Sequence, residues 1–405
     1  MSLSPHYHDF VPPHRLLMGP GPSLVHPRVL HALSLPLLGH LDPVFLGLMN
    51  EIQALLRLTF QTQNELTIAL SGTGSAGMEA VIANLIEDGD RAIVGVNGIF
   101  GSRLATMVER SGGTALRIEA PWGTTIPLDV VQDLLSRSAP VKAVILVHAE
   151  TSTGAWQPLQ EVGTLCRNYD ALFIVDAVTS LGGVPVEVDA WGIDACYSGT
   201  QKCLSCPPGL APLTLSARAL SAIRQRRAPC HSWYLDLALI ADYWGAQTRA
   251  YHHTAPISML YGLHEALRLV HEEGLAARMA RHQLNSDALM AGLHTLDLKP
   301  LPPAGHRLPM LNCVTLPERI DDVTVRTELL RDYGIEIGGG LGALRGQVWR
   351  IGLMGESCRQ SHVLTLLNAL EEIFARNGWL AQPGRAVQAA VETYTYSQLS
   401  ARRRA

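Results

Sequence analysis

Short apolar runs alternate with amphipathic stretches from about Glu65 to Ser216, and this alternation constrains the fold more than any other feature of the chain. Between the runs, apolar residues recur at helical spacing, as from Met78 to Ile86 and from Val130 to Leu135. Strands separated by helices favour a parallel sheet. The pattern therefore predicts an α/β fold with a mostly parallel sheet covered by helices. The candidate strands are Leu66–Leu70, Ala92–Val96, Ala115–Ile118, Ala143–Val147, Leu172–Val175, Ala195–Ser198 and Ala211–Leu215.

The C-terminal part predicts a second, smaller α+β unit. A chain of 405 residues is long for one simple core, so two lobes with a shared cleft are expected. The proline-rich stretch from Lys299 to Pro309 indicates a loop or linker. We expect an N-terminal segment at 1–22, a large domain at 23–273, a small domain at 274–378 and a peripheral extension without a clear pattern at 379–405. The small domain should contain strands at Cys313–Leu316 and Val348–Leu353, and helices at Val323–Tyr333 and His362–Phe374.

The composition argues against several classes of partner. Apolar residues make up 47% of the chain and charged residues 17%, as in compact globular proteins. The formal net charge of −4 offers no basic excess for a phosphate backbone, so we expect no nucleic-acid partner. No stretch reaches the roughly 18 apolar residues of a membrane span, and Met1 to Pro13 lacks the apolar core of a signal peptide. We expect a soluble, cytoplasmic protein without a membrane partner.

The seven cysteines are an odd number scattered along the chain, which argues against a disulfide framework. Cys203 and Cys206 form a C-x-x-C pair, but a zinc site would need two further ligands at compatible spacing, and none is evident. We expect no metal. Two unreactive loop thiols are favoured over a thioredoxin-like redox pair.

A glycine-rich segment from Ser71 to Gly77 lies between a predicted strand and a predicted helix. Its small residues let backbone N–H groups approach an anion at the helix N-terminus, where the helix dipole favours negative charge. The segment also matches the dinucleotide pattern G-x-G-x-x-G, but that pattern needs an acidic residue after the next strand, which here runs into Val96-Asn97-Gly98. We interpret it as a phosphate cradle for a mononucleotide-sized cofactor. A turn that only lets the helix pack closely is the alternative.

Two charged residues follow predicted strands. Asp176 ends the run Leu172–Val175, at the sheet edge where α/β proteins bind ligands. An acid there can keep a pyridine nitrogen protonated, although a loop cap is the commoner role. Lys202 follows Tyr197-Ser198-Gly199-Thr200-Gln201. A lysine that is partly removed from water has a lowered pKa, so its neutral amine can attack an aldehyde. Taken in isolation, however, a solvated loop lysine is the commoner case. A phosphate cradle, an acid and a lysine in this order are the three anchors that pyridoxal phosphate (PLP) needs.

Three other features gain meaning only in that context. Phe100 could stack on a pyridine ring or be a core aromatic residue. Arg350 is a charge inside an apolar strand, so it should meet either a structural carboxylate or a substrate carboxylate. The segment Tyr251–Thr254 offers two adjacent imidazoles, a poor arrangement for binding one metal.

Taken together, these segments resemble the class V aminotransferases, specifically the bacterial branch of the alanine–glyoxylate and serine–pyruvate aminotransferase group. The resemblance runs from about Leu16 to Phe374. The matching segments are LLMGPGPS (16–23), SGTGSAGMEA (71–80), VNGIFG (96–101), HAETSTGAWQPL (148–159), VDAVTSLGG (175–183), YSGTQK (197–202), YHHT (251–254), IEIGGGLG (335–342) and WRIGLMG (349–355).

The resemblance implies PLP fold type I, with a seven-stranded mixed sheet domain and a small C-terminal domain, in homodimers whose active sites lie at the subunit interface. It implies that Lys202 binds PLP as a Schiff base and then moves a proton between the substrate Cα and the cofactor C4′. Asp176 would pair with the pyridine nitrogen. The other ligands implied by the resemblance are Phe100 stacking on the ring, Thr151 near the phenolic oxygen, Thr73, Gly74, Ser75 and Gln201 at the phosphate, and Tyr251 and Thr254 of the partner subunit at the same phosphate.

Arg350 would bind the substrate α-carboxylate. The sequence departs from eukaryotic relatives at Ser75, where they often have histidine, and at Phe100, where they often have tryptophan; both changes look tolerable. The tail beyond Phe374 has no counterpart in the family, and its final Arg-Arg-Arg-Ala is not a peroxisomal address.

We therefore expect a transaminase that moves the amino group of alanine, or of serine, to glyoxylate in two half-reactions. Serine–glyoxylate and ureidoglycine–glyoxylate transamination are the nearest alternatives, because they would share every anchor. A cysteine desulfurase using Cys358, an NAD-dependent oxidoreductase and a non-catalytic scaffold are more remote alternatives. The preferred donor and the pathway are left open by the sequence.

Overall fold

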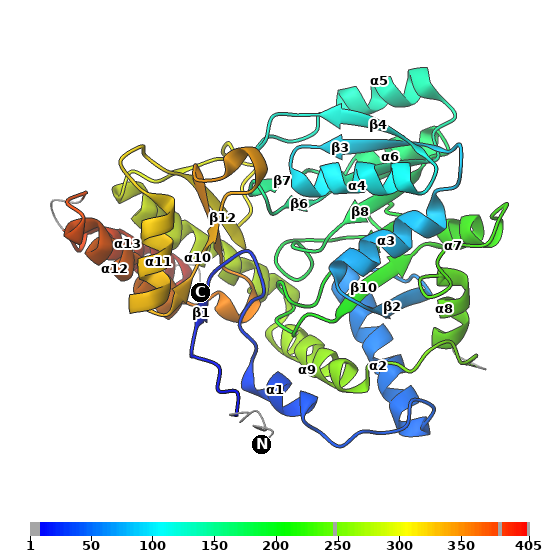
Figure 1. The fold of residues 1–405 in the computed structure, drawn as a ribbon, viewed down its shortest axis with the longest axis horizontal. Coiled ribbons are helices and arrows are strands. Elements are labelled where there is room, and N and C mark those ends of the chain that lie inside the picture. Colours follow the sequence, from blue (N-terminus) through cyan, green and yellow to red (C-terminus); the bar gives the residue numbers. More distant parts are fainter. Residues whose placement is uncertain (1–8, 246–248, 380–382, 403–405) are drawn as a thin grey trace, which may run out of the picture.

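The computed structural model describes residues 9–245, 249–379 and 383–402. The first eight residues of the expected N-terminal segment and the last three of the expected tail lie outside the described residues. The chain forms a large domain and a small domain side by side, with the N-terminal segment passing between them (Figure 1). The apolar core divides in the same way, into one cluster within the large domain and another around Trp349 and Phe374 in the small domain.

The large domain is built on a seven-stranded sheet, which confirms the predicted α/β fold. Its strand order is β2-β10-β9-β8-β5-β3-β4, and only β10 runs antiparallel to its neighbours. Each strand overlaps one of the predicted runs. The strands are β2 (Leu66–Ser71), β3 (Arg91–Val96), β4 (Thr114–Glu119), β5 (Ala143–Val147), β8 (Leu172–Asp176), β9 (Ala195–Tyr197) and β10 (Leu210–Leu215).

Helices cover both faces of this sheet, and every residue of the central strands β5 and β8 is therefore buried. The helices of this domain are α1 (Pro27–Leu33), α2 (Pro43–Phe60), α3 (Gly74–Leu85), α4 (Ile99–Arg110), α5 (Leu128–Ser138), α6 (Val162–Asn168), α7 (Ala217–Arg224), α8 (Leu237–Trp244) and α9 (Ile257–Glu273). A short hairpin of β6 (Ala149–Glu150) and β7 (Ala155–Trp156) follows β5. Among the described helices, none is both long enough and apolar enough to cross a membrane.

The small domain pairs four antiparallel strands in the order β11-β12-β15-β14. The predicted strands and helices are present, with ends shifted by at most two residues. The predicted loop Lys299–Pro309 is wrong at its start, because Lys299 and Pro300 pair with β12 as β11. The elements are α10 (Leu275–Thr295), β11 (Lys299–Pro300), β12 (Leu311–Thr315), α11 (Asp322–Asp332), β13 (Ile335–Glu336), β14 (Gly338–Gly339), the 3₁₀ helices η1 (Gly342–Leu344) and η2 (Gly355–Ser357), β15 (Val348–Gly352) and α12 (Gln360–Arg376).

The N-terminal segment is held by the small domain before it reaches the large one. Strand β1 (Leu16–Leu17) pairs in parallel with β13, and the N–H of Gly352 donates to the Met18 carbonyl at 2.7 Å. A Cβ on Gly352 would lie 1.9 Å from the Gly19 oxygen, so only glycine allows this approach. Further along, the Ser23 N–H donates to the Gln201 carbonyl of the large domain at 2.9 Å. The segment therefore links the two domains.

The chain beyond Phe374 contains a helix that the sequence pattern did not predict, α13 (Arg385–Arg402). Its Ala386 and Ala390 are buried against the small-domain core. The Tyr394 hydroxyl donates to Asn285 Oδ1 at 2.7 Å, and the Ala386 N–H donates to Glu371 Oε1 at 2.6 Å. The helix is thus part of the packed small domain, and the boundaries 274–378 and 379–405 stand only as proposals.

Gly292 in α10 provides a test of this packing. A Cβ there would lie 2.5 Å from Leu367 Cδ1 and 2.8 Å from the Ala386 oxygen, so Gly292→Ala should destabilise the protein by about 1–3 kcal/mol. Gly47→Ala in α2 is the matched control, because a Cβ added at Gly47 would meet no atom within 4 Å and the exchange should stabilise the helix by about 0.5–1 kcal/mol. Thermal unfolding of both variants checks the prediction. Equal stabilisation by the two exchanges would contradict the close packing of α13.

Candidate active site

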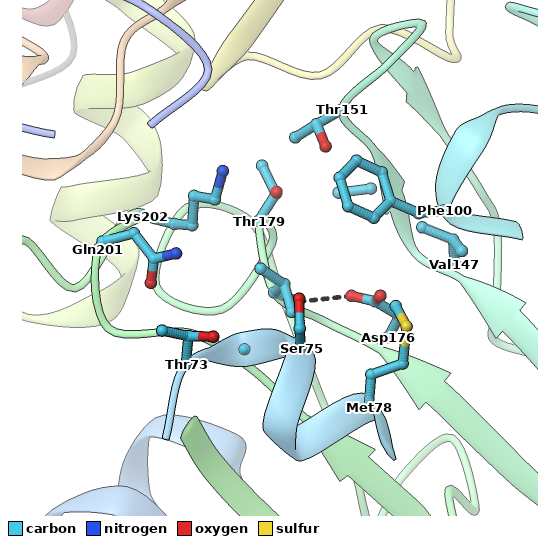
Figure 2. Close-up of a pocket in the computed structure, with 13 residues that line it drawn as sticks. Thr73, Ser75, Met78, Phe100, Val147, Thr151, Asp176, Thr179, Gln201 and Lys202 are labelled. Atoms are coloured by element: carbon cyan, nitrogen blue, oxygen red, sulfur yellow. Dashed lines mark hydrogen bonds between the residues drawn. The ribbon is translucent and has the colours of Figure 1, made fainter. Parts of the chain in front are cut away.

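A cavity of about 160 Å³ lies at the C-terminal ends of β5 and β8, beside the N-terminus of α3 (Figure 2). Eight of the candidate site residues from the large domain line it, although they come from five separate segments of the chain. The lining residues that sequence reasoning had not singled out are small or apolar. The cavity is lined by Thr73, Gly74, Ser75, Met78, Phe100, Val147, Ala149, Thr151, Asp176, Val178, Thr179, Gln201 and Lys202.

The glycine-rich segment forms one wall of the cavity. Thr73 is the N-cap of α3 and makes no side-chain cap bond, and the N–H groups of Gly74 and Ser75 have no hydrogen-bond partner in the described part of the chain. The segment therefore fits both the phosphate cradle and the close-packing turn that the sequence left open, each at different residues. Gly77 lets α3 approach the sheet, since a Cβ there would lie 3.0 Å from Ala211 Cβ, while free N–H groups at the helix N-terminus suit an anion.

Gln201 lies opposite Thr73 and turns its amide nitrogen toward the cavity (Figure 2). Its amide oxygen is buried and has no hydrogen-bond partner in the described residues. The Gln201 main chain is fixed by Ser23, whose N–H donates to its carbonyl at 2.9 Å. The amide nitrogen that faces the cavity is a hydrogen-bond donor, so this side of the cavity suits an occupant that accepts hydrogen bonds.

Asp176 is held rigidly at the end of β8. Its Oδ1 accepts from the Val178 N–H at 2.9 Å, and its Oδ2 accepts from the Tyr197 hydroxyl at 2.8 Å. Tyr197 can reach because β8 and β9 place the two residues in register as neighbours. Burial raises the pKa of Asp176 to about 6, and the two hydrogen bonds and the Lys202 charge oppose that rise. The site therefore contains a carboxylate whose ionised form would be favoured further by a cationic ligand.

Lys202 extends into the cavity from the turn after β9, with its amine toward Thr179 and Thr151 (Figure 2). Burial, followed by the charge of Arg350, lowers the pKa of this amine to about 8. Its Nζ donates to the Pro20 carbonyl, and its own carbonyl accepts from the Ser23 hydroxyl at 2.8 Å. A Cβ on Gly21 would lie 2.7 Å from Nζ, so the N-terminal segment packs directly over the amine.

Phe100 and Thr151 lie on the opposite wall from Lys202 (Figure 2). Phe100 is the second residue of α4, and the guanidinium of Arg103, one turn later, lies 5.0 Å from its ring centroid. This contact is of the cation–π kind. Phe100 therefore lines the cavity and is not one of the fully buried core aromatics.

Arg350 in β15 reaches from the small domain to the rim of the cavity. It is 7% exposed and forms no ion pair with a carboxylate in the described residues, so of the two alternatives a structural acidic partner is not found there. Instead, Nε donates to the Gly339 carbonyl at 2.8 Å and Nη1 donates to the Thr151 carbonyl at 3.3 Å. The two carbonyls come from different domains and fix the guanidinium without neutralising it. Its charge is available to an anionic ligand.

Tyr251 and Thr254 do not line this cavity. Tyr251 is 61% exposed, and its ring centroid lies 5.2 Å from that of His40 at the surface. His253 lies between them in the sequence, and its Nε2 forms a hydrogen bond of 2.7 Å with the hydroxyl of Ser71, at the start of the glycine-rich segment. An exposed position of this kind agrees with contact to a second chain. The role of both residues at a neighbouring phosphate stays a prediction.

Comparisons with known proteins identify close relatives. The profile of the family described as aminotransferase class-V matches residues 38–374. The (S)-ureidoglycine–glyoxylate transaminase of Bacillus subtilis is 42% identical over 401 residues, covering 94% of this chain and 96% of that protein. The alanine–glyoxylate aminotransferase of Drosophila melanogaster is 40% identical, covering 89% and 92%.

Solved structures agree with these relatives. The alanine–glyoxylate aminotransferase of Nostoc sp. superposes with a TM-score of 0.90 at 48% identity, covering 92% of this chain and all of that one. The ureidoglycine–glyoxylate aminotransferase of Bacillus subtilis superposes with a TM-score of 0.93 at 43% identity, covering 96% of this chain and all of that one.

The environment of Lys202 predicts a pH dependence that can be measured without any cofactor. A lowered pKa means that the amine is protonated below about pH 8 and neutral above it, so acetylation of Lys202 should rise with a midpoint near pH 8. Arg350→Leu removes a positive charge and should move the midpoint to higher pH. Mass spectrometry of the Lys202 peptide measures the modification, with the surface residue Lys299 as internal reference. If Arg350→Leu leaves the midpoint unchanged, the Arg350 charge does not lower the pKa of Lys202.

Proposed function

The chain belongs to the class V aminotransferase family, and we propose that it is a PLP enzyme that moves the amino group of a small amino acid, alanine first, to glyoxylate. The observation that carries this proposal is the pairing of groups in one cavity. A partly buried lysine with a lowered pKa and a buried aspartate held by two donors face the same space, beside a helix N-terminus with free N–H groups. Alanine as donor would leave as pyruvate, and glyoxylate would leave as glycine.

The donor set fits PLP at each of its polar groups. We propose that Thr73, Gly74, Ser75 and Gln201 bind the phosphate, because the N–H groups of Gly74 and Ser75 lack partners in the described part of the protein and the Gln201 amide nitrogen faces the cavity as a further donor. Asp176 would bind the pyridine nitrogen and Phe100 would pack on the ring face. Thr151 would lie near the phenolic oxygen. When bound, the cofactor supplies an electron sink for the charge that develops at the substrate Cα.

The residues of the chain then have distinct tasks. Asp176 holds a proton on the pyridine nitrogen, because its carboxylate is fixed by Val178 and Tyr197 and forms no ion pair with a described side chain. Lys202 in its neutral form can attack an aldehyde and can move a proton at the substrate Cα. Pro20 and Gly21 cover the amine and limit the access of water.

Arg350 is proposed to bind the substrate carboxylate. Two carbonyls fix its orientation, and its charge has no acidic partner among the described side chains. A guanidinium can bind a carboxylate through two parallel hydrogen bonds, which would also orient the Cα–H bond toward Lys202. Both amino donor and oxoacid acceptor carry a carboxylate, so one arginine serves both half-reactions.

Ureidoglycine as donor is the second candidate, because the (S)-ureidoglycine–glyoxylate transaminase of Bacillus subtilis is 42% identical over nearly the whole chain. The anchors named above contact groups that all α-amino acids share, so they favour neither donor. Serine is a third donor on the same grounds.

The more remote alternatives lose support. Cys358 is fully buried, and burial raises the pKa of its thiol to about 12, which makes it a poor nucleophile for desulfurase chemistry. A cysteine desulfurase of Thermococcus onnurineus has a similar structure, with a TM-score of 0.70, but at 17% identity it shows the shared fold alone. An oxidoreductase is excluded by the family, and no carboxylate follows β3 to bind a ribose.

We further propose a homodimer in which Tyr251 and Thr254 reach the phosphate of the other subunit. The exposed Tyr251 side chain supports this, as does a surface groove between α1, α2 and α9 that is lined by the exposed apolar side chains of Leu35 and Val44. An apolar surface of this kind is typical of subunit interfaces.

Borohydride reduction tests the cofactor assignment. Protein incubated with PLP and then reduced should carry a covalent mass increment on the peptide containing Lys202, because this amine is buried beside an acid in the cavity. Lys202→Ala should lose the increment while keeping its thermal stability. Peptide mass spectrometry locates the modification. An adduct on Lys142 or Lys299 instead would refute the assignment.

A donor screen with glyoxylate as acceptor tests the reaction. We expect glycine formation with alanine as the best donor and serine or ureidoglycine as weaker ones. Double-reciprocal plots at several glyoxylate concentrations should give parallel lines, because the first product leaves before the acceptor binds. Arg350→Leu should raise the KM of every donor by about tenfold or more, since it loses a bidentate ion pair. Clear preference for ureidoglycine would select the second candidate, and intersecting lines would contradict the two half-reactions.

A further inference from the structure

A fully buried carboxylate lies directly beside the cavity, and the proposed chemistry gives it no task. Glu150 ends β6, one residue before Thr151, and is 0% exposed. It forms no salt bridge with any described side chain. Burying a carboxylate without a cation is costly, so its retention next to the site requires a physical reason.

All the hydrogen bonds that the Glu150 carboxylate accepts within the described residues come from donors at the start of α4 and from Ser152. Its Oε2 accepts from the N–H groups of Phe100 at 3.1 Å and Gly101 at 3.2 Å. Its Oε1 accepts from the Ser152 N–H at 3.1 Å and from the Ser152 hydroxyl. The Ser152 hydroxyl oxygen in turn accepts from the Ile99 N–H at 3.0 Å. Together, Glu150 and Ser152 satisfy three N–H groups that the first turn of a helix leaves unpaired.

This donor set favours the ionised carboxylate. Two carboxylate oxygens offer about four lone-pair sites, and four donors point at them, so a proton on Glu150 would displace one donor. Burial raises the pKa of Glu150, while the bonds from Ser152 and Gly101 act in the opposite direction. The N-terminus of α4 also favours a negative charge through the helix dipole.

The packing leaves no alternative position for the start of α4. A Cβ on Gly98 would lie 2.4 Å from Glu150 Cδ and 2.5 Å from Ser152 Oγ. A Cβ on Gly101 would lie 2.4 Å from the Gly95 oxygen at the end of β3. The helix therefore begins in contact with the carboxylate on one side and with the sheet on the other. Its first residues can move only if these contacts are lost.

The same three residues connect opposite sides of the cavity. Glu150 and Ser152 point to α4, whereas Thr151 between them lines the cavity and its carbonyl accepts from Arg350 Nη1 at 3.3 Å. Phe100, whose N–H is bound by Glu150, lines the cavity beside Thr151 (Figure 2). The Glu150 carboxylate thus fixes Phe100 relative to Thr151, whose carbonyl binds Arg350.

We propose that Glu150 is a positioning residue, which holds Phe100 against the cofactor ring and keeps Thr151 and Arg350 in register with it. This inference rests on the proposed function, since Phe100 has a ring to pack on only if PLP occupies the cavity. Glu150 itself touches neither cofactor nor substrate. Its effect should appear in how firmly and in what orientation the cofactor is held.

Glu150→Gln tests the proposal with little change in shape, because the amide replaces one acceptor by an N–H₂ group that faces main-chain donors. We expect the dissociation constant of PLP to rise by about tenfold or more, as one or two charge-assisted hydrogen bonds are lost. The visible circular dichroism of bound PLP should weaken, because the ring loses its fixed wall. Equilibrium dialysis and visible circular dichroism are the readouts.

Glu371→Gln is the matched control. Glu371 is also buried, at 2% exposed, and accepts a main-chain N–H, that of Ala386 at 2.6 Å, but it lies in the small domain between α12 and α13. This variant should lower thermal stability and leave PLP affinity and circular dichroism at wild-type values. Ser152→Ala is a second test, because it removes the hydroxyl that links Glu150 to Ile99, and it should weaken PLP binding in the same direction by a smaller factor.

The outcomes separate this inference from the proposed function. Wild-type protein that takes up no PLP would refute the proposed function. Wild-type uptake together with unchanged affinity and dichroism in Glu150→Gln would overturn the role of Glu150 alone. If Glu150→Gln fails to fold, Ser152→Ala decides: weaker PLP binding supports the proposal, and wild-type binding overturns it. Equal losses in Glu371→Gln and Glu150→Gln would indicate a general stability effect and also overturn it.

Discussion

The structure depends on holding groups of opposite charge in a cavity that excludes most water. Asp176 and Lys202 are both removed from solvent, and burial moves the pKa of the acid up to about 6 and that of the amine down to about 8. Each shift makes the charged form harder to keep. The fold compensates Asp176 through two donors placed by β8 and β9, and it supplies Lys202 with the Pro20 carbonyl. The resulting site holds charged groups that could bind a ligand with a phosphate and a ring nitrogen.

The large domain lines this cavity, but three parts of the chain contribute to the site. The sheet of the large domain supplies the acid and the lysine, the small domain supplies Arg350, and the N-terminal segment covers the amine. These parts meet at glycines where a side chain would not fit. A Cβ on Gly154 would lie 2.8 Å from Cys313 Cβ, and a Cβ on Gly352 would lie 1.9 Å from the Gly19 oxygen. Arg350 can donate to the Thr151 carbonyl because the backbones of these parts approach each other closely.

The residues that the sequence did not reveal as important act through groups distant in the chain. Tyr197 appeared only as a strand residue within a family motif, yet its hydroxyl holds Asp176, 21 residues away. Glu150 gave no signal of its own, because the N–H groups that it binds belong to residues about 50 positions earlier. Helix α13 was missed for a related reason: two of the buried residues on its face, Ala386 and Ala390, are small and fit against the small-domain core without a strong apolar pattern.

The sequence by itself determined the α/β architecture, and with it the glycine-rich segment, Asp176 and Lys202 as candidates, because strand and helix periodicity is local and ligands collect at the ends of parallel strands. Thr151 and Gln201, which also line the cavity, were implied only by the resemblance to the class V family. Tertiary structure alone decided which atoms satisfy the buried charges. Arg350 illustrates the difference: an unpaired guanidinium in an apolar strand pointed to a carboxylate, but the folded chain offers it two carbonyls from different domains. Hydrogen-bond partners depend on distances between segments far apart in the chain, and those distances are set only when the domains pack.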